Sequence, residues 1–103
     1  MLDDEKDLFS QIQAISLKFE RKNEGYRHSS WLVYIATKCI LDEFDVTAFQ
    51  LGAGQGKTFV ALLLAEYHSE QDDYVAIIVP SKILQQQFES YANKFLEYKV
   101  DVV

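Results

Sequence analysis

Apolar side chains recur at helical spacing in two stretches of the first 44 residues. In the first stretch they are four, three and four residues apart, at Leu8, Ile12, Ile15 and Phe19. The second stretch follows Ser29 and Ser30, either of which can cap a helix. Its apolar face comprises Leu32, Ile35, Ala36, Cys39 and Ile40. Such spacing places apolar residues along one side of a helix, so we predict a helical segment over residues 1–44.

Residues 45–103 instead alternate between continuous apolar runs and helical patterns. The three runs that favour strands are VTAFQL (46–51), YVAIIV (74–79) and KVDVV (99–103). Residues 57 to about 68 are apolar nearly all round, which predicts a helix covered on more than one side. A last amphipathic helix has apolar positions at Leu84, Phe88, Tyr91 and Phe95. This order predicts an α/β fold with about three parallel strands joined by right-handed crossovers.

A glycine-rich segment lies between the first predicted strand and the apolar helix. It comprises Gly52, Ala53, Gly54, Gln55, Gly56, Lys57 and Thr58. Glycines let phosphate groups approach bare main-chain N–H groups, and the first turn of the next helix adds further unpaired donors. This arrangement predicts a phosphate-binding loop for a nucleoside triphosphate.

The two residues that end this loop have separate predicted roles. The Lys57 ammonium would reach the β- and γ-phosphates, and the Thr58 hydroxyl would bind Mg²⁺. Lys57 and Thr58 are therefore the candidate catalytic residues, Thr58 is the candidate metal ligand, and ATP with Mg²⁺ is the expected cofactor. One departure is that Leu51 stands where the general pattern has its first glycine.

Composition and charge limit the remaining function classes. The chain has 103 residues, 49% of them apolar, and a net charge of −6. This fits one small globular domain and argues against a broad basic face for binding nucleic acid regardless of sequence. The single cysteine, Cys39, the acidic N-terminus and the lack of a long apolar stretch indicate an intracellular, cytoplasmic protein without a membrane span.

Two blocks, residues 50–65 and 76–88, together resemble superfamily 2 motors, which include helicases and SecA-type translocases. In the second block, AIIVPSKILQQQF, Pro80 and Leu84 match a helicase motif, whereas Ile83 departs from it. The resemblance implies a partial RecA-like P-loop domain over residues 45–103, with three layers and two preceding helices. It also implies a nucleic acid or polypeptide track near Lys82.

The resemblance further implies that parts of a complete motor are missing. The family's Asp-Glu motif has no counterpart here, because Asp101 lacks an adjacent glutamate. We therefore expect a truncated lobe that binds ATP, hydrolyses almost none alone, and associates with the remaining half of a motor or with copies of itself. One alternative is a non-enzymatic interaction module that retains a relic loop. Another is a small P-loop kinase, which Leu51 and the lack of any arginine after Arg27 disfavour.

Overall fold

A computed structural model of the chain describes residues 3–22, 26–41 and 56–103. Within these ranges the chain forms four helices and two very short strands. In chain order they are α1 (Asp3–Lys22), α2 (Ser30–Leu41), α3 (Lys57–Glu70), β1 (Ala76–Ile77), α4 (Lys82–Phe95) and β2 (Asp101–Val102). All four helices cover the segments that the spacing of apolar residues predicts.

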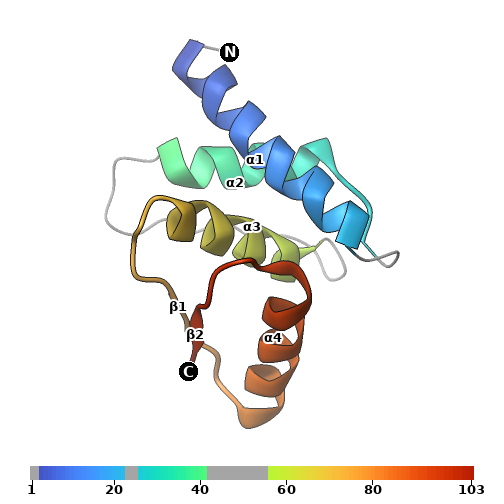
Figure 1. Cartoon of the computed structure of the whole chain (residues 1–103), viewed down its shortest axis with the longest axis vertical. Coiled ribbons are helices and arrows are strands. Elements are labelled where there is room, and N and C mark those ends of the chain that lie inside the picture. Colours follow the sequence, from blue (N-terminus) through green and yellow to red (C-terminus); the bar gives the residue numbers. More distant parts are fainter. Residues whose placement is uncertain (1–2, 23–25, 42–55) are drawn as a thin grey trace.

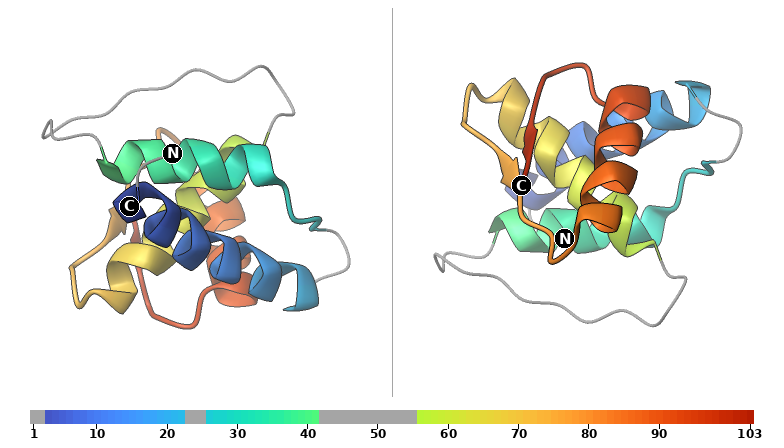
Figure 2. Two further views of the ribbon diagram at one scale, coloured as in Figure 1. Left: turned by 90° about the horizontal axis from the view of Figure 1, so that it is seen from above. Right: turned by 90° about the horizontal axis from the view of Figure 1, so that it is seen from below.

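The helix α3 occupies the middle of the molecule. Figure 1 shows α1 and α2 on one side of it, and α4 with the two strands on the other. The two further views in Figure 2 agree with this arrangement. Val60, Leu62, Leu63 and Ala65 of α3 are all buried. The central position explains why this helix is apolar nearly all round, as the sequence analysis predicted.

The helices α1 and α2 place their predicted apolar faces inward. Leu8, Ile12, Ile15 and Phe19 are all buried in α1, whose acidic first turn and basic last turn suit the helix dipole. In α2 the residues Leu32, Ile35 and Ala36 are buried, and Cys39 and Ile40 pack against the core. The Ser29 hydroxyl accepts the Leu32 N–H at 3.4 Å, so this serine caps α2.

A cluster of aromatic rings joins the two sides of the molecule. The Phe95 ring of α4 lies 5.3 Å from that of Phe19 and 5.4 Å from that of Phe59, measured between ring centroids. The Tyr26 ring lies 4.5 Å from that of Phe59. The core therefore combines residues from all four helices and from the connection before α2.

The predicted three-layer, RecA-like α/β fold with three parallel strands is wrong. In the described residues the chain is mostly helical, and its sheet consists of β1 and β2 alone. These strands are parallel, as predicted, with Ala76 opposite Asp101 and Ile77 opposite Val102. The predicted strand at residues 46–51 lies outside the described residues.

The misinterpretation came from the apolar run at residues 74–79. A continuous apolar run is typical of strands that are covered on both faces. Here only Val75, Ile77 and Val79 are partly buried, whereas Tyr74, Ala76 and Ile78 are exposed. One face of this strand therefore packs on α3 and the other faces solvent.

Candidate functional site

The described part of the glycine-rich segment is the start of α3. This helix begins at Lys57 and has Gly56 as its N-terminal cap, with Thr58 half-buried in the first turn. The N–H groups of Phe59 and Val60 donate to the Gly56 carbonyl at 3.0 and 3.1 Å. The N–H groups of Lys57 and Thr58 precede these bonds, and helix geometry provides them with no acceptor inside the helix. Two adjacent main-chain donors thus point out of the helix end.

Gly56 needs to be glycine for two structural reasons. Its φ of 84° and ψ of 28° place it in the left-handed region, which side chains other than glycine disfavour. A Cβ atom at this position would also lie 2.8 Å from the Leu32 Cδ1 atom of α2. The left-handed backbone and the close contact with Leu32 therefore each favour glycine at this position, independently of any phosphate ligand.

Replacing Gly56 with alanine should lower the free energy of unfolding by about 1–2 kcal/mol, because a left-handed non-glycine residue costs about that much. The crowding falls on the end of the Leu32 side chain, which can shift. Urea denaturation followed by circular dichroism measures the loss, with Ser90→Ala on the exposed face of α4 as a control that should stay within about 0.5 kcal/mol. A Gly56→Ala protein as stable as the wild type would contradict this account.

The other residues of the predicted loop cannot be placed. Gly52, Ala53, Gly54 and Gln55 lie outside the described residues, and so does the Lys57 side chain. The structure therefore describes only the last part of the predicted loop. This part is Gly56, the main chain of Lys57, and the whole of Thr58, and it forms the start of α3. It leaves the remaining loop residues as predictions from sequence.

The second block of the family resemblance forms the turn into α4. The Ser81 hydroxyl accepts the Leu84 N–H at 3.2 Å, so Ser81 caps this helix. Lys82 is the first residue of α4 and is exposed. In Figure 1, α4 begins at the bottom of the molecule, away from the first turn of α3. Among the described residues, the two blocks meet through Ala61, Leu64 and Ala65 of α3, which line one trough together with Ala76 and Ile77.

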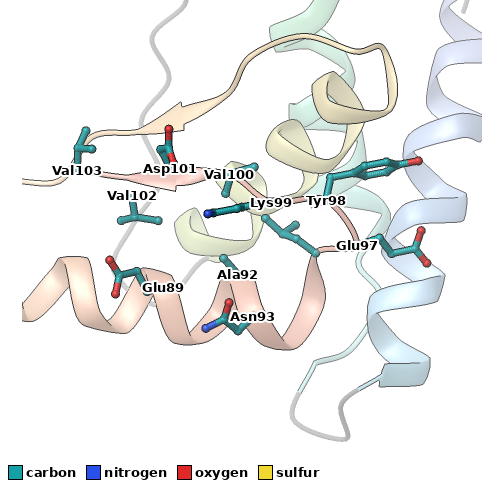
Figure 3. A pocket seen from close by; sticks show the side chains of 11 residues that line it. Glu89, Ala92, Asn93, Glu97, Tyr98, Lys99, Val100, Asp101, Val102 and Val103 are labelled. Carbon is teal, nitrogen blue, oxygen red and sulfur yellow. The ribbon is translucent and has the colours of Figure 1, made fainter.

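A shallow hollow of about 500 Å³ lies between α4 and the segment that contains β2. Figure 3 shows Glu89, Ala92 and Asn93 of α4 on one side of it and residues 97–103 on the other. Its charged side chains have both signs, since Lys99 lies among Glu89, Glu97 and Asp101. Among the described residues of the glycine-rich segment, neither Gly56 nor Thr58 lines this hollow.

Sequence reasoning missed the buried carboxylate of Glu66. This side chain of α3 is fully buried, and both of its oxygens accept the Glu97 N–H, at 3.2 and 3.0 Å. Burial raises the pKa of Glu66. This rise is opposed by hydrogen bonds from the Glu97 and Tyr98 N–H groups and by the nearby positive charges of Lys18 and Lys22. Perturbed carboxyl groups often mark active sites, but main-chain donors and full burial indicate a structural role here.

Two lysines of α1 complete the surroundings of Glu66. Lys18 Nζ lies 2.8 Å from Glu97 Oε1, and Lys22 Nζ donates to the Phe95 carbonyl at 2.9 Å. The bond between Lys18 and Glu97 raises the pKa of Lys18 and lowers that of Glu97. Together, these contacts of Glu66, Lys18 and Lys22 hold the connection between α4 and β2 against α1 and α3.

A second polar group, near the end of α1, was also not predicted. The buried Ser16 hydroxyl lies 2.5 Å from the Tyr26 hydroxyl and 2.9 Å from His28 Nδ1. His28 is half-buried, and its main-chain N–H donates to the Glu20 carboxylate at 2.6 Å. Burial raises the pKa of Tyr26. Because Ser16 is fully buried, it cannot serve as a nucleophile for an external substrate, and the group orders the connection into α2.

Comparisons of this chain with known proteins identified no relative. No family model, no curated protein and no solved structure matches the chain. The resemblance to superfamily 2 motors therefore stays a prediction.

Across residues 3–22, 26–41 and 56–103, no three His, Cys, Asp or Glu side chains gather in a way that would hold a metal ion. None of the helices in these ranges is long and apolar enough to cross a membrane.

Proposed function

We propose that this chain binds a nucleoside triphosphate, with ATP as the expected ligand, through residues 52–58. The single observation that carries the proposal is the sequence Gly-Ala-Gly-Gln-Gly-Lys-Thr ending in the first turn of a helix. The N–H groups of Lys57 and Thr58 supply donors at the positive end of the α3 dipole. The left-handed Gly56 supports a tight entry into that helix.

In this proposal each named group has one task. Main-chain N–H groups of the glycine-rich segment cradle the phosphates, the Lys57 ammonium neutralises the β- and γ-phosphates, and the Thr58 hydroxyl binds Mg²⁺. Hydrolysis should stay near background, because a phosphoryl-transfer site also needs a carboxylate that positions Mg²⁺ and water. Asp101 does not fill that role, since it accepts the Tyr74 hydroxyl at 2.7 Å across the sheet.

Isothermal titration calorimetry with ATP and Mg²⁺ tests this proposal. Lys57→Ala should abolish measurable binding, because it removes the charge that faces the phosphates. Lys82→Ala is the matched control, since it removes an exposed lysine from the first turn of another helix and should leave affinity unchanged. Equal ATP affinity in the wild type and Lys57→Ala would refute the proposal.

The expectation that a nucleic acid or polypeptide track binds near Lys82 rests on the family resemblance alone. The RecA-like fold that accompanied it is wrong for the described residues, so the proposal extends to nucleotide binding and not to motor activity. Titrating ADP and GTP beside ATP would define base and phosphate preference.

A second candidate, a non-enzymatic interaction module, is favoured by an exposed aromatic pair on α2. Trp31 is 57% exposed and stacks on Tyr34, with ring centroids 6.0 Å apart. Exposed aromatic side chains of this kind are enriched where proteins bind partners. Absence of binding heat with ATP, ADP and GTP alike would favour this second function over the first.

A further inference from the structure

A chain of three hydrogen-bonding groups joins the end of α1 to the connection before α2. The Ser16 hydroxyl lies in the middle, 2.5 Å from the Tyr26 hydroxyl and 2.9 Å from His28 Nδ1. Ser16 and Tyr26 are buried, whereas His28 is half-buried. Within the part of the chain that the structure describes, neither hydroxyl has another hydrogen-bond partner. The imidazole is therefore the group through which solvent protons reach this chain of bonds.

The number of hydrogens on these groups decides whether every one of them has an acceptor. Two contacts hold two hydrogens, and the two hydroxyls supply two. When the imidazole is neutral and carries its hydrogen on Nε2, the Tyr26 hydroxyl donates to Ser16, and the Ser16 hydroxyl donates to His28 Nδ1. This form of His28 leaves no buried hydroxyl hydrogen without an acceptor, so the geometry selects it.

Protonation of the imidazole adds one hydrogen too many. Nδ1 of His28 then donates to Ser16, so either the Ser16 or the Tyr26 hydroxyl loses its acceptor. A buried donor without an acceptor is costly, because it gave up its bonds to water on folding. Turning the ring away from Ser16 does not remove this cost, since the Ser16 hydroxyl would then have no acceptor. The neutral form is therefore the one that fits the folded chain.

The charged groups around His28 do not reverse this preference. From α1, the Glu20 carboxylate accepts the main-chain N–H of His28, but Glu20 is exposed, so solvent screens its attraction for a charged imidazole. Arg27, the preceding residue, is exposed and has the opposite charge. The side of α3 meets this connection through Phe59, which has no charge. None of the ion pairs between described side chains includes His28.

The connection that contains His28 packs against the start of α3. The Tyr26 ring lies 4.5 Å from the ring of Phe59, in the first turn of α3. Leu32, in the first turn of α2, lies against Gly56. In Figure 1 and in both views of Figure 2, α2 and α3 begin at the same end of the molecule. A change that loosens the connection therefore also loosens the contacts at the start of α3.

We propose that the contact between His28 and Ser16 is a pH-sensitive switch. In its neutral form His28 holds the connection before α2 against the start of α3, and protonation of the imidazole releases that connection. The folded chain takes up this proton less readily than the unfolded chain, so stability is lost as the pH falls through the range in which histidine becomes charged. This switch does not depend on nucleotide binding, which Lys57→Ala tests separately.

Urea denaturation of the full chain and of His28→Asn, at about pH 8 and about pH 5, tests the switch. The asparagine oxygen can accept the Ser16 hydroxyl in place of Nδ1, and asparagine takes up no proton. The folding equilibrium constant of the wild type, relative to His28→Asn, should fall about tenfold between the two pH values. His68→Asn is the matched control, because protonated His68 gains the Asp73 carboxylate as a partner at 3.3 Å. The wild type should not lose stability relative to this variant on acidification.

Two further measurements test the hydrogen count itself. Nuclear magnetic resonance of the imidazole nitrogens at about pH 8 should show His28 with its hydrogen on Nε2. In a Ser16→Ala background, replacing His28 with asparagine should no longer give a difference that grows on acidification, because the crowded hydroxyl is absent. A pH-independent difference between the wild type and His28→Asn, a wild type that gains relative stability on acidification, or a hydrogen on Nδ1 at about pH 8 would overturn the proposal.

Discussion

Replacing Phe95 with alanine should lower the free energy of unfolding by about 3–5 kcal/mol, the range for large aromatic side chains removed from a core. Phe95 is 1% exposed and is the only residue of α4 that is fully buried. Its ring contacts those of Phe19, Tyr26, Phe59 and Tyr91 at centroid distances from 5.3 to 6.4 Å. Removing it would leave a cavity between α1, α3 and α4, which the rigid neighbouring rings cannot close.

A loss of this size should be easy to detect. Domains of this length have a total stability of about 5–15 kcal/mol, so Phe95→Ala should be partly unfolded or melt at a much lower temperature. Urea denaturation followed by circular dichroism measures the change. Phe95→Leu should lose less, because it keeps part of the buried volume. Tyr98→Ala, at a half-exposed position, should change stability by less than about 1 kcal/mol. Equal losses for Phe95→Ala and Tyr98→Ala would contradict the assigned core.

Replacing Glu66 with leucine should cost about 1–3 kcal/mol at neutral pH, because the Glu97 and Tyr98 N–H groups lose their acceptor. Leucine keeps a similar side-chain size, so a cavity contributes little to this loss. The connection between α4 and β2 should then become mobile, and amide hydrogen exchange at residues 97–98 should speed up. Unchanged exchange there would contradict the role of Glu66.

The pH dependence gives a second measurement on the same carboxyl group. Burial raises the pKa of Glu66 in the folded state above its ordinary value of 4.5. The folded protein therefore binds this proton more tightly than the unfolded chain does, and stability is lost as the pH rises through the raised pKa. Glu97 acts in the opposite direction, because its lowered pKa gives stability that is lost as the pH falls.

The variant Glu66→Gln isolates the first effect, because glutamine does not titrate and keeps one acceptor oxygen. We expect its stability relative to the wild type to improve as the pH rises from about 4.5 through the raised pKa of Glu66, and then to level off. Denaturation curves of both proteins across that range measure the difference, from which the contribution of Glu97 largely cancels. A difference that does not vary with pH would show that Glu66 titrates alike in the folded and unfolded chains.

The sequence by itself determined the four helices. The apolar residues of α1, α2 and α4 recur at the helical period, and the serines that precede α2 and α4 cap them. Amphipathic spacing of this kind depends on residues within one turn or two of each other, so it can be recognised without knowing the fold. The all-round apolar character of α3 also indicated its central position. The sequence of the glycine-rich segment also led to the proposed ligand, a nucleoside triphosphate, although only the last residues of this segment are described.

Only the tertiary structure decided how the strands are covered and which polar groups are buried. The run from Tyr74 to Val79 predicted two covered faces, but whether a second layer reaches the outer face depends on distant parts of the chain. Glu66 meets Glu97 across 31 positions, and Ser16 meets Tyr26 across 10. The position of such partners is set by how helices pack, and no local pattern of residues records it.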